Sequence, residues 1–156
     1  QPYGTEALST LRIEMGHVAG SELDGRTIPY DASLEGLVSK KKDFIGKRSL
    51  NRSAFTSTDR EKLVGVVPID KTTSIPEGSY IVKDPKAKLP NPKLGHVSAS
   101  CWSVEYDNPF SLAIIKDGKN MIGQKLFAMS PLKNKTIPVE IVSSHYVDPE
   151  GKRVRS

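Results

Sequence analysis

From residue 60 onward the sequence consists of short apolar runs, each bounded by Gly, Pro, Asn or Asp. Strands of this length and spacing, with little sequence left for helices, are typical of a small closed barrel. We therefore expect an antiparallel β-barrel across residues 60–150, with Val64, Val66, Ile114 and Val139 facing its interior. The expected strands are 63–69, 79–83, 94–104, 110–116, 124–129 and 136–143.

The chain opens with a pattern of a different kind. Leu8, Leu11 and Met15 recur at the spacing of one helical face, which predicts an amphipathic helix. Thr5 is placed to cap the start of this helix, and Gly16 is placed to end it in a left-handed turn.

The rest of the first 58 residues predicts a small α/β piece. A glycine-containing loop over 18–28 precedes an expected strand at 34–38 and a second short helix at about 47–54. The polar stretch 56–60 is the expected boundary. The predicted fold class is therefore α+β, with an α/β piece over residues 1–58 followed by a β-barrel domain over residues 59–156.

Composition narrows the class of protein. The chain has 156 residues, 37% of them hydrophobic, which fits one domain or two small lobes and argues against disorder. No apolar run approaches the roughly 20 residues that cross a membrane, and no signal peptide opens the chain. The first residue is not Met, which suggests a processed chain or an excised fragment. Cys101 is the one cysteine, so no disulfide forms within the chain; we expect it to be buried, in a cytoplasmic protein.

The net charge of +5 raises the question of nucleic-acid binding. The basic residues are spread along the chain and cluster only at 40–42 and 152–155. Proteins that bind single strands interleave basic residues with exposed aromatics, whereas core packing explains Trp102, Tyr106 and Phe110 in strand-like sequence. We therefore expect no nucleic-acid partner. A basic surface also attracts an anionic small molecule or an acidic partner subunit.

The residues that carry chemistry do not form a self-contained active site. His17, His96 and His145 are far apart in sequence and have no cysteine pair nearby, so we expect no metal site. The glycines at 16 and 20 follow a helix and not a strand, which lacks the context of a dinucleotide-binding fingerprint. We therefore expect no catalytic residue in this chain and no enzymatic turnover from it alone.

Glu14 is the one polar residue that breaks a local rule. It falls in the last turn of the expected helix, which is the unfavourable end of the helix dipole for a carboxylate. Such a residue either serves a site or is simply solvated or paired with Arg12 or His17.

Several motifs in order resemble the aminomethyltransferase family, which has the fold of the glycine cleavage T-protein. They are YGTEAL at 3–8, LRIEMGH at 11–17, GSELDGRT at 20–27 and KKDFIG at 41–46. Within the family, GHVAG at 16–20 and YVDPEGKR at 146–153 are most similar to the C-terminal part of the alpha subunits of heterotetrameric sarcosine oxidases. The resemblance covers essentially the whole chain.

The resemblance implies a folate-linked function shared with a missing N-terminal half. That half holds the family's catalytic aspartate, and this chain would help to transfer a one-carbon unit from oxidised sarcosine to tetrahydrofolate. Glu14 matches the carboxylate that contacts the pteridine ring, where a carboxylate accepts paired hydrogen bonds. Tyr146 is a candidate to flank the folate, and Lys42 to meet its glutamate tail, although T-proteins tend to carry arginine there.

The same resemblance implies where the other components lie. Flavin and NAD would be bound by the intact enzyme and not by this region, and the partners would be the rest of the alpha subunit and the other subunits. Two alternatives remain open. One is a fragment of a T-protein or a related folate-dependent demethylase; the other is a non-catalytic domain that docks partner subunits.

Overall fold

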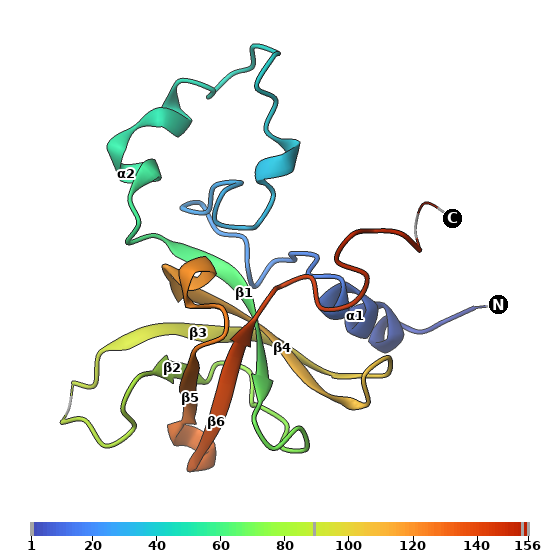
Figure 1. Ribbon diagram of the computed structural model, residues 1–156, viewed down its shortest axis with the longest axis vertical. Coiled ribbons are helices and arrows are strands. Elements are labelled where there is room, and N and C mark those ends of the chain that lie inside the picture. Colours follow the sequence, from blue (N-terminus) through green and yellow to red (C-terminus); the bar gives the residue numbers. More distant parts are fainter. Residues whose placement is uncertain (1, 89, 154, 156) are drawn as a thin grey trace.

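The computed structural model describes residues 2–88, 90–153 and 155 and shows a closed barrel of six antiparallel strands. The strands follow one another around the barrel in the order β1-β4-β3-β2-β5-β6 (Figure 1). This confirms the predicted fold class. The strands are β1 (Glu61–Pro68), β2 (Tyr80–Val82), β3 (Lys93–Ser103), β4 (Asn108–Lys116), β5 (Lys125–Ser130) and β6 (Lys135–Val142).

The remaining elements are short. A helix, α1 (Thr5–Glu14), precedes the barrel and packs on the outside of β3 and β4. The connection to β1 contains a second helix, α2 (Ser53–Thr56). The described residues also form four 3₁₀ turns, at Glu35–Leu37, Ser49–Asn51, Gly118–Met121 and Pro131–Lys133. No helix of the described residues is long and apolar enough to cross a membrane.

The barrel interior holds three of the four residues expected there. Val64, Val66 and Val139 are fully buried in the main apolar cluster, which confirms their predicted direction. Ile114 was expected inside, and this was wrong, because Ala113 and Ile115 fill the interior from β4. Ile114 packs in the second apolar cluster on the outer face. Since β4 is covered on both faces, its sequence lacks the alternation that would identify the inner one.

The outer cluster lies where α1 meets the barrel. It contains Ile13, Leu63, Val67, Ala99, Phe110 and Leu112, with Ile114 and Cys101 packed against it. Cys101 is only half-buried in this position and not fully buried as expected. Trp102 and Tyr106 were expected in the core together with Phe110, but both are about half exposed, and only Phe110 is buried.

The helix α1 is present as predicted, but its buried face is different. Ile13 and Glu14 are buried, whereas Leu8 and Leu11 are 52% and 53% exposed. Gly4 and not Thr5 occupies the N-cap position. The expected end at Gly16 is confirmed, since Gly16 has φ +70° and its N–H donates to the carbonyl of Ile13 at 3.0 Å.

Residues 33–60, called the arm below, project from the barrel as an irregular excursion (Figure 1). The expected strand at 34–38 was wrong: these residues form a 3₁₀ turn at Glu35–Leu37 and pair with no strand of the described chain. An isolated strand is unstable without a neighbour to accept its hydrogen bonds, and none lies beside it here. The expected helix at 47–54 appears only as the 3₁₀ turn Ser49–Asn51 followed by α2.

Asp31 fixes the base of the arm to the barrel. Its carboxylate is buried and accepts hydrogen bonds from the Arg60 guanidinium and, at 3.1 Å, from the Lys62 ammonium. Its backbone carbonyl accepts a hydrogen bond from the N–H of Leu63 at 2.7 Å. A second ion pair, between Glu35 and Lys119, joins the arm to the turn after β4.

Candidate functional site

Glu14 is buried and joins three parts of the chain. Its side chain is only 5% exposed, and its Oε1 accepts hydrogen bonds from the Ser103 hydroxyl at 2.6 Å and the Val104 N–H at 3.0 Å. Its backbone carbonyl accepts the N–H groups of Tyr146 and Val147, both at 3.1 Å. The alternative that the Glu14 carboxylate as a whole is solvated is therefore wrong, because Oε1 is held by the protein.

The alternative that Glu14 pairs with Arg12 or His17 is also wrong. The Arg12 guanidinium instead forms an ion pair with Glu22, at 3.2 Å, and donates a hydrogen bond to the backbone carbonyl of His17 at 3.3 Å. The carboxylate of Glu14 therefore meets hydrogen-bond donors from β3 and the following turn, with no cation bonded to it among the described residues.

The two oxygens of Glu14 are in different situations. Oε1 already accepts two hydrogen bonds, whereas Oε2 accepts none from the described residues. No fully buried side-chain oxygen or nitrogen in the described part of the chain lacks a partner, so Oε2 retains contact with solvent. Glu14 therefore presents one free anionic acceptor on a carboxylate whose other oxygen is fixed by the fold.

Tyr146 lies beside Glu14 but is engaged in packing. Its ring stacks on Phe110, with centroids 4.3 Å apart and planes 5° from parallel, and contacts Tyr106 at 4.6 Å. Its hydroxyl accepts a hydrogen bond from the Asn108 side-chain amide at 3.1 Å. The structure therefore brings Glu14 and Tyr146 together through the backbone, and the ring of Tyr146 packs against those of Phe110 and Tyr106.

Lys42 lies elsewhere, on the arm. Its backbone N–H donates to the Ser39 hydroxyl at 3.0 Å, and its backbone carbonyl accepts the Lys47 ammonium at 2.8 Å. Within the described residues no hydrogen bond or ion pair joins Lys42 to Glu14 or Tyr146, and the arm projects away from α1 (Figure 1). Two of the three candidate residues are therefore close together, and the third is not.

Sequence reasoning did not identify the donors to Glu14. Ser103 and Val104 lie 89 and 90 positions after Glu14, and only the packing of α1 on β3 brings them together. Asn108, which holds the Tyr146 hydroxyl, is buried and was not identified either. No pattern in the sequence links residues so far apart, so no sequence signal could have found these contacts.

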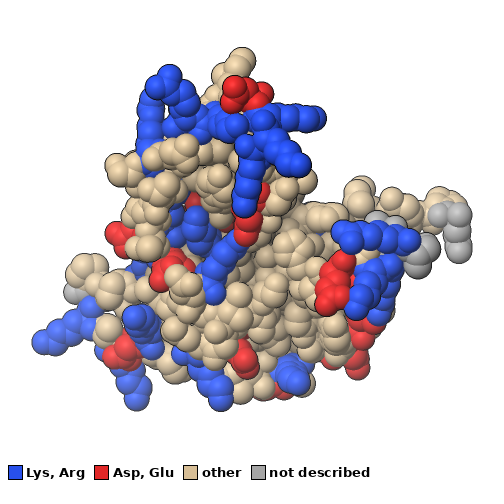
Figure 2. Space-filling model, turned by 45° about the horizontal axis from the view of Figure 1, so that its top comes forward, with Lys and Arg blue, Asp and Glu red and all other residues tan. Residues whose placement is uncertain are grey.

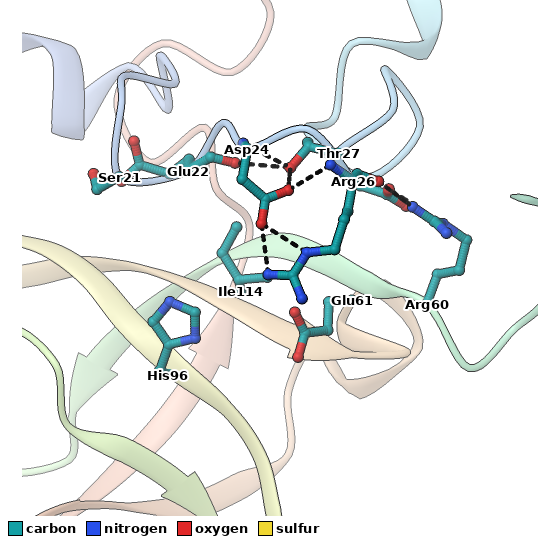
Figure 3. Close-up of a pocket in the computed structure, with 10 residues that line it drawn as sticks. Ser21, Glu22, Asp24, Arg26, Thr27, Arg60, Glu61, His96 and Ile114 are labelled. Carbon is teal, nitrogen blue, oxygen red and sulfur yellow. Dashed lines mark hydrogen bonds and ion pairs between the residues drawn. The ribbon is translucent and has the colours of Figure 1, made fainter.

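A polar cavity of about 410 Å³ lies between the 21–31 loop and the outer face of the barrel (Figure 3). Most of its charged groups are paired with one another: Asp24 with Arg26, and Asp31 with Arg60. His96 lines the cavity from β3, and Glu61 from β1 (Figure 3). A cavity whose charges are mostly satisfied internally is better explained as the junction between loop and barrel than as a ligand site.

Glu22 lies at the same junction and is buried. Burial alone would raise the pKa of its carboxyl, but the nearby Ser98 hydroxyl, hydrogen bonds from the Ala19 N–H and the Ser21 hydroxyl, and the Arg12 charge lower that pKa below its usual value. Glu22 is therefore an ionised structural carboxylate that fixes the loop after α1.

The three histidines do not form a metal site. His17 and His145 line one cavity of about 410 Å³, together with Gly16 and Val18, while His96 lies in the other cavity. Within the described residues no three His, Cys, Asp or Glu side chains gather as metal ligands would.

The sequence of the chain matches a known protein family. Residues 61–148 match the model of the glycine cleavage T-protein C-terminal barrel domain, a match to more than half of the chain. The chain belongs to this family. It is 38% identical, over 98% of its length, to the sarcosine oxidase subunit alpha of Rhizobium meliloti (strain 1021). It is 30% identical, over 90% of its length, to an aminomethyltransferase of Synechococcus sp. (strain CC9902).

The family relatives are much longer than this chain. The chain spans 16% of the Rhizobium subunit and 37% of the Synechococcus aminomethyltransferase. The crystal structure of the aminomethyltransferase T of the Bartonella henselae glycine cleavage system has the same fold, with a TM-score of 0.72 over 92% of this chain and 38% of that one, at 22% identity. The barrel and α1 are therefore one region of a larger family architecture.

Proposed function

We propose that the chain is the C-terminal folate-binding region of a sarcosine oxidase alpha subunit. The observation that supports this most directly is Glu14, whose match to the pteridine-binding carboxylate of the family coincides with a free Oε2 on a fixed carboxylate. The 38% identity to sarcosine oxidase alpha subunits over almost the whole chain favours this subfamily. A cytoplasmic location fits a chain with one unpaired cysteine.

A pteridine can donate hydrogen bonds to this carboxylate, but to one of its oxygens and not to both. The ring carries an amino group and a ring N–H on one edge, and both are donors. Because Oε1 is already occupied by Ser103 and Val104, the two donors would converge on Oε2 rather than take one oxygen each. Tetrahydrofolate bound there would accept the one-carbon unit released from oxidised sarcosine, while Glu14 orients the ring.

The supporting residues have separate proposed roles. Ser103 and Val104 hold the carboxylate, and the Tyr146 ring, stacked on Phe110, forms an aromatic wall for the folate. Lys42 would meet the glutamate tail only as a point charge, because an ammonium has no bidentate geometry. We further propose the division into a folate-binding lobe at 1–58 and a barrel domain at 59–156. Flavin, NAD and the catalytic groups would lie in other parts of the intact enzyme.

The substitution Glu14→Gln tests the proposal in the intact enzyme. Glutamine keeps its own Oε1 for Ser103 and Val104, but it replaces the free anionic oxygen with an amide NH₂ that faces the donors of the pteridine. Loss of one charge-assisted hydrogen bond costs about 1.5–3 kcal/mol, which corresponds to roughly a ten- to hundred-fold weaker binding of tetrahydrofolate. Sarcosine oxidation should be largely unchanged, because the flavin site lies elsewhere.

The matched control is Glu6→Gln, an exposed carboxylate in the first turn of the same helix. It should leave folate affinity unchanged, and thermal melts of both variants should show that any loss of binding does not follow from unfolding. Parental folate affinity in Glu14→Gln would reduce Glu14 to a structural residue. Unchanged folate binding together with loss of subunit association would instead favour the docking-domain alternative.

The rival within the family is a T-protein or another folate-dependent demethylase. Its separation from the proposed function depends on the polypeptide in which the chain occurs. A polypeptide that also carries a dinucleotide-binding region, and an enzyme that oxidises sarcosine, would support the alpha subunit. Folate-dependent transfer without sarcosine oxidation would support the rival.

A further inference from the structure

One side of the barrel carries apolar residues on its outer face, although neither α1 nor the arm covers it. On β5, Leu126 and Ala128 belong to the interior cluster, so the alternating Phe127 and Met129 point outward. Outward positions of an antiparallel sheet that face water are normally polar. The helix α1 packs on β3 and β4 instead, and Figure 1 shows α1 and the arm on other sides of the barrel from β2 and β5.

The strand register joins these residues into one continuous surface. Phe127 lies opposite Pro138 on β6 and opposite Val82 on β2. Ile69 continues this row from the end of β1, because its N–H donates to the carbonyl of Pro138 at 3.0 Å. Ile69 is 45% exposed, and Pro138 is exposed beside it. The surface, called the β5 face below, comprises Ile69, Tyr80, Val82, Phe127, Met129 and Pro138.

Lysines lie at the ends of the strands that form the β5 face. The segments 69–93 and 125–140 contain eight Lys but only four Asp or Glu. All eight lysines are exposed, and within the described residues none forms an ion pair: Lys71, Lys83, Lys86, Lys88, Lys93, Lys125, Lys133 and Lys135. Figure 2 shows basic side chains protruding at the lower left of the barrel, apart from those on the arm.

The acidic residues of these segments do not neutralise the lysines. The carboxylates of Asp70 and Asp84 accept backbone N–H groups of their own turns. Glu140 lies opposite Lys125 in the strand register, but no ion pair joins the two side chains in the described structure. The β5 face is therefore an apolar centre with a rim of positive charge that the described chain leaves uncompensated.

We propose that the β5 face docks another protein subunit of the enzyme, through a surface of that subunit that is acidic around an apolar centre. The inference rests on the proposed function, which makes the chain part of a multi-subunit oxidase. The Rhizobium relative, 38% identical to this chain, is itself named as a subunit. An apolar centre with a polar rim is the usual anatomy of a protein interface, and the positive rim requires a partner of negative charge.

Charge and shape favour this occupant over three others. Two copies of the β5 face would bring lysines against lysines across a two-fold axis. A membrane-binding surface inserts protruding apolar side chains, whereas Phe127 and Met129 lie partly buried within a sheet. A surface that its own polypeptide covers during folding has no need of a lysine rim for solubility, but a surface that waits for a separate subunit does.

Zero-length crosslinking of the intact enzyme tests the proposal. A carbodiimide joins a lysine ammonium to a carboxylate in contact with it, and peptide mass spectrometry identifies both residues. Lys93, Lys125 and Lys135 should be joined to Asp or Glu residues of another subunit, and these crosslinks should weaken at high salt. Lys116, which is exposed at the end of β4, gives the background yield of crosslinks to other subunits.

Charge reversal provides a second readout. Lys125→Glu combined with Lys135→Glu should raise the dissociation constant of the docked subunit at least about ten-fold, because like charges would then face each other. The control, Lys116→Glu combined with Lys152→Glu, makes the same change of net charge at exposed positions elsewhere and should leave that constant unchanged. Sedimentation velocity measures the association, and thermal melts of both variants should match the parent because all four positions are exposed.

The outcomes separate the alternatives. Crosslinks that join these lysines only to the same polypeptide or to a second copy of it would overturn the proposal, and so would association that charge reversal leaves unchanged. Binding to vesicles of anionic phospholipid without crosslinks to another subunit would assign the β5 face to a membrane instead.

Failure of the docking proposal can be distinguished from failure of the proposed function, because neither measurement uses folate. An enzyme that oxidises sarcosine and binds tetrahydrofolate, yet yields no crosslinks from the β5 face to another subunit, would refute the docking alone. A polypeptide that assembles with no other subunit and oxidises no sarcosine would refute both.

Discussion

Replacement of Asp31 by asparagine should destabilise the chain by releasing two cations at the base of the arm. The Asp31 side chain accepts hydrogen bonds from Arg60 and Lys62, and also the backbone N–H of Ile28 at 3.1 Å. In Asp31→Asn the charge is lost, and the new NH₂ group faces a guanidinium or an ammonium. Both cations would then be left partly buried without a counter-ion.

The expected loss of stability follows from how deeply the two ion pairs are buried. Removing one partner of a fully buried ion pair costs about 3–5 kcal/mol, whereas an exposed pair contributes about 1 kcal/mol or less. Asp31 is buried, but the Arg60 and Lys62 side chains are 20% and 18% exposed, so solvent compensates part of the loss. We expect a cost of about 2–3 kcal/mol, which lowers the melting temperature of a chain of this size by about 4–12 °C.

The pH dependence identifies the cause. Burial alone would raise the pKa of Asp31, but the hydrogen bonds from Arg60, the Ile28 N–H and Lys62 outweigh it and lower that pKa below its usual value. A carboxyl with a depressed folded-state pKa stabilises the fold above its unfolded value of about 3.9, and this contribution is lost as the pH falls through the folded value. The melting difference between parent and Asp31→Asn should therefore be constant from neutral pH down to about 5 and shrink in stronger acid.

Asp24→Asn is the matched control, because Asp24 also pairs with an arginine but on an exposed loop. Solvent screens that pair, so the control should melt close to the parent at neutral pH. Thermal melts followed by circular dichroism, from pH 7 to pH 2, measure both variants. If Asp31→Asn melts with the parent, or if its deficit persists undiminished at the lowest pH, the ion pairs do not hold the base of the arm.

Two further predictions concern single residues near Glu14. Gly16→Ala should lower the free energy of unfolding by about 1–2 kcal/mol or more, because φ is +70° and the new Cβ would lie 2.5 Å from the Ser144 carbonyl oxygen. The control Gly25→Ala, whose Cβ would have no atom within 4 Å, should change that free energy little; urea titrations measure both variants. Cys101 should resist alkylation at pH 8 in the native protein and react after addition of urea. Burial and the Glu14 charge raise the pKa of its thiol to about 12, which leaves roughly a thousand-fold less thiolate than an unperturbed cysteine would have. Fast alkylation of the native protein would contradict this environment.

The strands of the barrel were predictable because residues next to each strand determine where it begins and ends. Each strand is bounded by turn residues that fix where it ends, and all six observed strands overlap the expected ones. The direction of a side chain is clearest from sequence where polar residues mark the other face of the strand, as on β6, where the buried Val139 is followed by Glu140. On β4, where apolar residues occupy consecutive positions, Ile114 was placed inside and lies outside.

The helix α1 shows the limit of periodicity. The spacing of Leu8 and Leu11 correctly predicted a helix, but not which face the barrel covers. The barrel buries Ile13 and Glu14 because β3 offers hydrogen-bond donors at its end, and that depends on residues about 90 positions away. The exposed leucines are a second apolar surface that the described chain leaves uncovered.

The arm was mispredicted for a related reason. The apolar run at 34–38 has the composition of a strand, but a strand needs a neighbour for its hydrogen bonds, and the described chain supplies none there. The conformation of such a segment depends on the surface that covers it, so its local sequence does not determine it.

The site around Glu14 gains from being part of the fold. A surface glutamate that binds a ligand loses rotamer freedom at that moment, at a cost of about 0.5–1.5 kcal/mol. At Glu14 the fold has already met this cost, because Ser103 and Val104 hold Oε1 while Tyr146 and Val147 hold the backbone carbonyl. The free Oε2 is therefore presented in one position before any ligand arrives. It follows that Ser103→Ala should weaken the binding of tetrahydrofolate without removing any group that contacts it, because the carboxylate would then be held by Val104 alone.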